Sequence, residues 1–145
     1  MATKGLKTLI RLSKWNVDEK QRVLVALQGR EDEILSWIAQ SEVQLKEEQR
    51  VASEDPSGVG FAYAAFHSAW MGRREQLFSM LDMVRAEIVR ARDALAEAFN
   101  ELKTYEITQR ERERRAQAEL DRKEQAFLDE IGLNIHRRKE PGEEG

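Results

Sequence analysis

The chain lacks cysteine altogether, and it has only two proline and eight glycine residues in 145. Without cysteine, a disulfide framework, a thiol nucleophile and a cysteine-ligated zinc site are excluded. The prolines and glycines are too few for the frequent turns of a β-sandwich, a β-barrel or a βαβ fold. No run of about 18 uncharged apolar residues exists either, so we expect a soluble protein without a signal peptide or a transmembrane span.

Charge and strong helix formers dominate what is present. Charged residues make up 35% of the chain, whereas about a quarter is typical. Alanine, leucine, glutamate, arginine and glutamine are abundant, and these residues favour long helices. The formal net charge is −3, so the composition gives no general attraction to nucleic acid or to anionic lipid.

One segment interrupts the helical composition. Residues 53–60 read Ser-Glu-Asp-Pro-Ser-Gly-Val-Gly, where Pro56 disfavours helix at Asp55 and the glycines permit a turn. We therefore predict one hairpin domain over 1–139, which comprises a helix at about 3–52, a loop at about 53–60 and a helix at about 61–135. Residues 140–145 are expected to form a flexible acidic tail.

Both predicted helices carry a seam with alternating spacings of three and four residues. Such a period near 3.5, sustained over about four heptads, indicates a coiled coil. The first seam contains Leu6, Ile10, Ser13, Val17, Lys20, Leu24, Leu27, Glu31, Ile34, Ile38, Ser41, Leu45, Glu48 and Ala52. The second contains Leu77, Leu81, Val84, Ile88, Ala91, Leu95, Ala98, Leu102 and Tyr105.

The short connection predicts an all-α fold, a long antiparallel two-helix coiled-coil hairpin. The numbers of two facing residues should then sum to about 114. The start of the first helix, at about residue 3, therefore lies opposite about Glu111 of the second helix. Beyond that point the seam becomes polar, at Arg112, Ala116 and Glu119. We therefore expect an overhanging C-terminal helical arm from about Arg112 to Ile135, supported by opposite charges at helical spacing.

The arm ends in apolar residues that an intact hairpin would leave uncovered. They are Leu120, Phe127, Leu128, Ile131 and Leu133. They are interpreted either as a partner-binding tip or as ordinary packing, if the arm folds back or dimerises. Basic and acidic residues are nearly equal in number from Glu106 to Lys139, which favours a solvated or protein-facing surface over a nucleic-acid grip.

Candidate catalytic and metal-binding groups are sparse. His67 and His136 lie in no metal-ligand spacing, so we expect no metal. The adjacent carboxylates Asp129 and Glu130 point in different directions on a helix, and no phosphate loop or nucleophile elbow occurs. We therefore expect no enzyme activity and no cofactor.

The aromatic residues are explained mostly by packing beside the seam or at the turn: Trp15, Trp37, Phe61, Tyr63, Phe66 and Trp70.

Both ends of the chain resemble the flagellar export proteins of the FliJ family. The opening, Leu6-Lys7-Thr8-Leu9-Ile10-Arg11-Leu12 followed by Trp15, Val17 and Asp18, is similar to the family's start. The family's closing segment is similar to the following residues of this chain: Lys103-Thr104-Tyr105-Glu106-Ile107, Arg112, Arg115, Glu119, Arg122-Lys123-Glu124-Gln125 and Leu128-Asp129-Glu130-Ile131. The resemblance covers nearly the whole chain, although residues 53–71 carry no signature of the family.

The resemblance implies a cytoplasmic component of the flagellar type III export apparatus, at the inner-membrane-associated base of the flagellum. It implies binding to the hexameric export ATPase and to the cytoplasmic domain of the export gate protein, and a part in handling export chaperones. Association with the membrane would come only through these partners, and no nucleic acid is expected. The expected ring-facing residues are Leu6, Leu9, Ile10, Leu12, Arg112, Arg115, Arg122, Phe127, Leu128, Asp129 and Ile131.

Three other interpretations stay open at this point. The closest is the equivalent stalk of a virulence type III secretion system, which would share the fold and differ in its partners. A coiled-coil holdase chaperone would use apolar tips to grip unfolded clients. A nucleic-acid-binding coiled coil would use the basic residues between Arg110 and Arg115.

Overall fold

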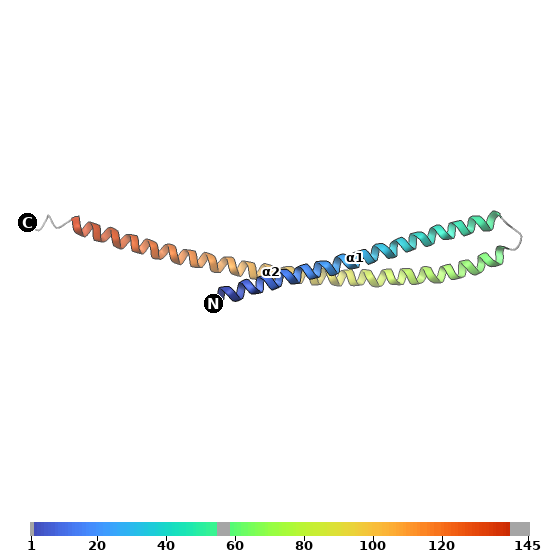
Figure 1. Cartoon of the computed structure of the whole chain (residues 1–145), viewed down its shortest axis with the longest axis horizontal. Coiled ribbons are helices and arrows are strands. Elements are labelled where there is room, and N and C mark those ends of the chain that lie inside the picture. The colour runs from blue at the N-terminus through green and yellow to red at the C-terminus, as the bar shows by residue number, and fades with distance from the viewer. Residues whose placement is uncertain (1, 55–58, 140–145) are drawn as a thin grey trace, which may run out of the picture. The chain divides into compact units, whose positions relative to one another are not determined.

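The protein is all-α and consists of two long helices that pack against each other as a hairpin. The computed structural model describes residues 2–54 and 59–139. Helix α1 spans Ala2–Glu54 and helix α2 spans Val59–Lys139 (Figure 1). The predicted fold class, an all-α two-helix hairpin, is confirmed.

The helix bounds differ from the sequence prediction by a few residues. Helix α1 includes Ser53 and Glu54, and α2 begins at Val59, so the helices take up both ends of the predicted loop. Residues 55–58, the rest of that loop, and the predicted tail lie outside the described residues. Helix α2 also continues past Ile135 to Lys139 because its last turn is basic, which suits the partial negative charge of a helix C-terminus.

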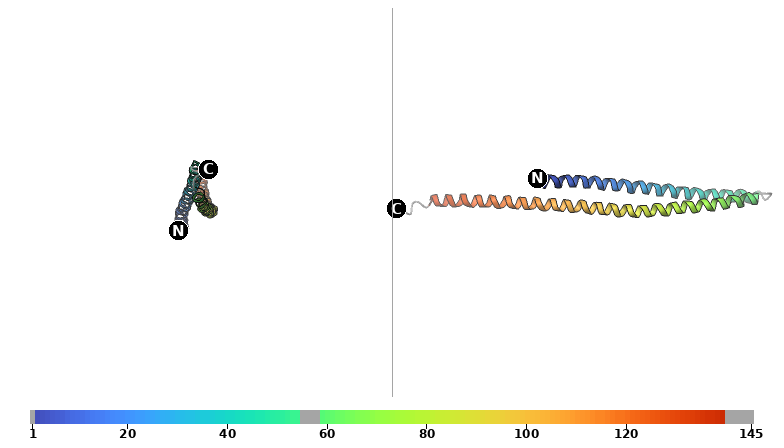
Figure 2. Two further views of the ribbon diagram at one scale, coloured as in Figure 1. Left: turned by 90° about the vertical axis from the view of Figure 1, so that its right-hand side faces the viewer. Right: turned by 90° about the horizontal axis from the view of Figure 1, so that it is seen from below.

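The chain divides into two compact units. The hairpin unit is Ser13–Asn100, and the terminal unit combines Met1–Leu12 with Glu101–Gly145. Within the hairpin unit, α1 and α2 run side by side in opposite directions, and a second direction of view agrees (Figure 2). Each unit therefore contains a stretch of both helices.

The predicted seams form the packed face of both helices. Every residue of the two predicted seams is buried or half-buried. The tightest packing is in the hairpin unit, where Ile34 is 1% exposed and clusters with Leu81, Val84 and Ile88. Burying each side chain of this size stabilises the fold by about 1.5–3 kcal/mol. The heptad spacing thus identifies the core side chains correctly, apart from Trp70, which is also buried but precedes the predicted seam of α2.

Polar contacts across the hairpin unit agree with the predicted register. The Trp70 indole Nε1 donates a hydrogen bond to the Ser41 carbonyl oxygen at 2.9 Å. Arg74 Nε lies 3.4 Å from Glu42, and Arg85 Nε lies 3.1 Å from Glu31. The residue numbers in these pairs sum close to the predicted value of about 114, as an antiparallel pair with a short connection requires.

Candidate partner-binding surface

The terminal unit carries a helical arm with no internal cover. Every residue from Arg112 to Lys139 is exposed, whereas Leu102 is buried and Tyr105 half-buried in the same unit. We call residues 112–139 the arm. The change from a packed to an exposed surface falls where the apolar seam gives way to arginine and glutamate. The sequence reasoning placed this change at the same residue.

Local ion pairs support the first half of the arm as a helix. Glu111 accepts from Arg114 at 2.7 Å and from Arg115 at 3.3 Å, and Glu119 accepts from Arg122 at 2.7 Å. These pairs lie one helical turn apart, where such contacts contribute about 0.2–0.5 kcal/mol each. Gln117 also donates a hydrogen bond to Asp121, and Gln125 donates one to Asp129, both at 3.0 Å.

The same pairs shift the titration of the carboxylates. Hydrogen bonds from the Arg114 guanidinium, and then its positive charge, lower the pKa of Glu111, and the charge of Arg115 adds to this. Arg122 lowers the pKa of Glu119 in the same way. Both carboxylates therefore stay ionised, and keep their arginine partners, to a lower pH than an isolated glutamate would.

Large apolar side chains are exposed toward the end of the arm. Phe127 is 63% exposed, and Leu128 is 59% exposed. Ile131 follows Phe127 by four residues and Leu128 by three, so all three lie on neighbouring parts of one helix face. Leu120 extends this apolar stripe by about two turns toward the start of the arm, and Ile135 extends it by about one turn toward the end. Exposed apolar residues grouped in this way make this face of the arm the candidate partner-binding surface.

The structure separates the predicted N-terminal residues into two groups. Leu6 and Ile10 are buried within the terminal unit, so they are occupied in packing and present little surface to a partner. Leu9 and Leu12 are 44% and 58% exposed. All of the predicted residues on α2 are exposed: Arg112, Arg115, Arg122, Phe127, Leu128, Asp129 and Ile131.

The aromatic residues follow the expectation of packing only in part. Trp70 is buried, and Tyr63 and Phe66 are half-buried, whereas Phe61 is 88% exposed. His67 lies between Tyr63 and Trp70, with ring centroids 5.9 Å from each. Trp15 and Trp37 also keep exposed faces, so they are not core residues.

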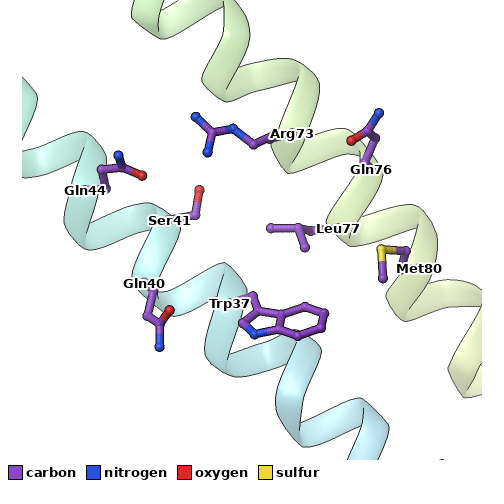
Figure 3. Close-up of a pocket in the computed structure, with 8 residues that line it drawn as sticks. All are labelled: Trp37, Gln40, Ser41, Gln44, Arg73, Gln76, Leu77 and Met80. Carbon is purple, nitrogen blue, oxygen red and sulfur yellow. The ribbon is translucent and has the colours of Figure 1, made fainter.

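A groove between the helices was not anticipated from the sequence. It has a volume of about 350 Å³ and is lined by Trp37, Gln40, Ser41 and Gln44 of α1 and by Arg73, Gln76, Leu77 and Met80 of α2. Figure 3 shows Arg73 and Leu77 reaching toward α1 beside Ser41 and Trp37. The sequence signal was weak, because Ser41 was only one of several polar residues in the seam of α1.

Within residues 2–54 and 59–139, no group of three or more His, Cys, Asp or Glu side chains could hold a metal ion. Neither described helix has a stretch long and apolar enough to cross a membrane.

The paired seams and the exposed arm define a helical-hairpin protein of the coiled-coil class. The sequence model of the family described as "Flagellar FliJ protein" matches residues 3–141. The chain therefore belongs to the flagellar FliJ family. The resemblance noted at both ends of the sequence is thus confirmed over nearly its whole length.

Relatives with the same description support this membership. Two flagellar FliJ proteins of Caulobacter vibrioides are each 28% identical to the chain over 131 residues. They come from strains NA1000 / CB15N and ATCC 19089 / CIP 103742 / CB 15. The aligned region covers 90% of this chain and 94% of each relative. No solved structure matches the chain.

Proposed function

We propose that the chain is a non-enzymatic component of the flagellar type III protein export apparatus. It acts as a stalk in the cytoplasm, at the inner-membrane-associated base of the flagellum. There it binds the hexameric export ATPase ring, links the ring to the cytoplasmic domain of the export gate protein, and handles export chaperones. Membership of the flagellar FliJ family supports the flagellar part of this proposal.

The uncovered arm is the observation that carries the ring-binding part. A helix that exposes Phe127, Leu128 and Ile131 costs free energy in water, which a partner surface would recover at about 25 cal/mol per Å² of apolar area covered. Arginine–glutamate pairs already support the arm as a helix. Binding would therefore not have to offset the entropy of folding that segment, and pre-organisation of this kind favours affinity.

The proposed contact surface follows from burial. Leu9 and Leu12 supply it on α1, because Leu6 and Ile10 of the expected set are buried. On α2 it uses the exposed part of that set, with arginines for charge pairing and apolar residues as anchors: Arg112, Arg115, Arg122, Phe127, Leu128, Asp129 and Ile131. Buried aromatic and arginine anchors commonly dominate the binding energy of an interface, so Phe127 is the first candidate.

Coupling requires no catalysis by the stalk. One helical arm in a ring of identical subunits contacts only some of them at once, so the subunits become inequivalent. Differential contacts of this kind shift the conformational equilibrium of the contacted subunits. Hydrolysis in the ring is thereby linked to engagement of the gate at another face of the hairpin.

The direct test measures oligomeric state and ATP hydrolysis of the cognate export ATPase. The whole chain should promote ring assembly and hydrolysis, and a chain truncated before Arg112 should not. As a finer comparison, Phe127→Ala with Ile131→Ala should reproduce the loss. The matched control truncates two exposed apolar side chains of the hairpin unit, Val43→Ala with Val89→Ala, and should leave stimulation intact.

Other outcomes would redirect the proposal. No binding of the whole chain to the ATPase would contradict the stalk. Suppression of aggregation of an unrelated client, lost on the same truncation, would then favour a holdase chaperone. Stronger stimulation of the ATPase of a virulence type III secretion system than of the flagellar one would favour the equivalent stalk of that system.

A further inference from the structure

The arm carries a short heptad seam that no part of the described chain covers. Its members alternate in spacing between three and four residues, as the packed seams of the hairpin do, and all of them are exposed: Asp121, Glu124, Leu128, Ile131, Ile135 and Arg138. Leu128 is 59% exposed and Ile135 is 50% exposed. We call these six residues the arm seam. A seam with this period fits a second helix, because a facing helix offers side chains at the same spacing.

Charge is separated along the arm seam. Two acidic residues, Asp121 and Glu124, precede the apolar ones, and Arg138 follows them. Within the part of the chain that the structure describes, none of these three side chains forms an ion pair, unlike Arg114 and Arg122 of the same arm. Two parallel arms would therefore repel each other at both ends. Antiparallel arms would instead bring the acidic end of each to the basic residue of the other.

An antiparallel second copy matches this pattern. Coiled-coil packing sets alternate seam positions opposite each other, and a two-fold axis repeats every contact. With that axis midway between the two central residues of the arm seam, the facing pairs are Leu128 with Ile131, Glu124 with Ile135, and Asp121 with Arg138. The centre is then apolar, and each end joins opposite charges. Glu124 lies one turn from Asp121, so the arginine of the second copy has two carboxylates within reach.

One exposed leucine of the arm lies off the arm seam. Leu133 is 57% exposed, close to the 59% of Leu128. It falls midway between Ile131 and Ile135 in the sequence, which turns its side chain to the opposite side of the helix. The arm thus contains two leucines of nearly equal exposure on different faces. Pairing through the arm seam would cover only Leu128.

We propose that the arm pairs antiparallel with the arm of a second copy of this chain, through the arm seam. The paired segment, residues 121–138, is only about 26 Å long. It is therefore smaller than the interfaces of permanent dimers, and the pairing is weak and reversible. Pairing covers apolar side chains that the proposed function assigns to the ATPase ring, so the second copy and the ring compete. The inference itself does not rest on that function, because it concerns copies of this chain alone.

The test is sedimentation equilibrium of the whole chain from micromolar to millimolar concentration. The chain should show a reversible monomer–dimer equilibrium, and truncation before Arg112 should abolish it. Leu128→Ala should lower the association constant about tenfold or more, because the two-fold axis makes one substitution truncate two buried side chains. Leu133→Ala is the matched control and should leave the association constant unchanged.

Charge reversal tests the orientation of the two arms. Arg138→Glu should lower the association constant about tenfold or more, because carboxylates then face each other at both ends. Adding Asp121→Arg and Glu124→Arg to the same chain should restore association, since the two ends again carry opposite charges. In a parallel pair the triple variant would still set like charges against each other. Circular dichroism of each variant checks that its helicity is retained.

Four results would overturn the proposal. A chain that stays monomeric at millimolar concentration would leave the arm seam to another partner, such as the ATPase ring. Association that survives the truncation would place the contact outside the arm. Equal losses in Leu128→Ala and Leu133→Ala would indicate apolar clustering without a defined face. Failure of the triple variant to restore association would contradict the antiparallel arrangement.

Discussion

At the residue scale, Ser13 is the least satisfied side chain that the structure describes. It is 7% exposed, and its hydroxyl is buried with no hydrogen-bond partner. A buried hydroxyl left unpaired costs about 1–3 kcal/mol, and alanine also has the higher helix propensity. Ser13→Ala should therefore raise the free energy of unfolding by about 1 kcal/mol. The measurement is urea unfolding followed by circular dichroism. The exposed Ser79→Ala should give a smaller gain, and equal gains would contradict a specific effect of burial.

The paired carboxylates predict how the arm responds to acid. The pKa values of Glu111 and Glu119 are lowered from their ordinary value of 4.5. The contribution of these carboxylates to the stability of the helical arm is therefore complete above that value. It is lost as the pH falls through the lower pKa of the folded state. Carbon chemical shifts of residues 111–122, measured by NMR in the whole chain, should move toward coil values only below about pH 4.5. Glu119→Gln should remove the change of the carbon chemical shifts with pH around Arg122.

At the element scale, the arm should be separable in stability from the seam. Ala118 lies in the exposed arm, whereas Ala91 is buried in the seam. A proline inside a helix removes a hydrogen bond and costs about 3 kcal/mol or more where the helix must stay formed. Ala118→Pro should therefore leave the melting temperature of the buried seam nearly unchanged, while Ala91→Pro should lower it sharply. Equal effects on thermal unfolding would show that the arm is packed.

The sequence predicts the packed face of each element well, because heptad spacing converts directly into burial. Every seam residue from Leu6 to Tyr105 was assigned correctly, and so was the loss of burial at Arg112. The contact of Trp70 with Ser41 was not predictable, since a backbone carbonyl carries no residue-specific signal. The expected partner set stays a prediction, and the structure adds that two of its members, Leu6 and Ile10, are buried in the seam. The sequence could not separate them from Leu9 and Leu12, because all four are apolar residues of the same short segment.

At the scale of the whole molecule, the exposed area predicts weak sensitivity to denaturant. The chain exposes 11563 Å², whereas a compact monomer of its 16.8 kDa would expose about 7,700 Å². Unfolding therefore uncovers roughly three-quarters of the area that a compact protein of this size would uncover. The slope of the unfolding free energy against urea should be lower in the same proportion. A slope typical of a compact 145-residue protein would indicate association that covers the excess area.

The local pairing of charges in the arm has a consequence for the kinetics of encounter. Arg114, Arg115 and Arg122 each sit beside a glutamate one turn away, so their fields largely cancel within a few ångström. Long-range attraction accelerates association only where charge of one sign accumulates. Capture of the arm by a partner should thus depend little on ionic strength, and the lifetime of the complex should be set by how well Phe127 and its neighbours are enclosed.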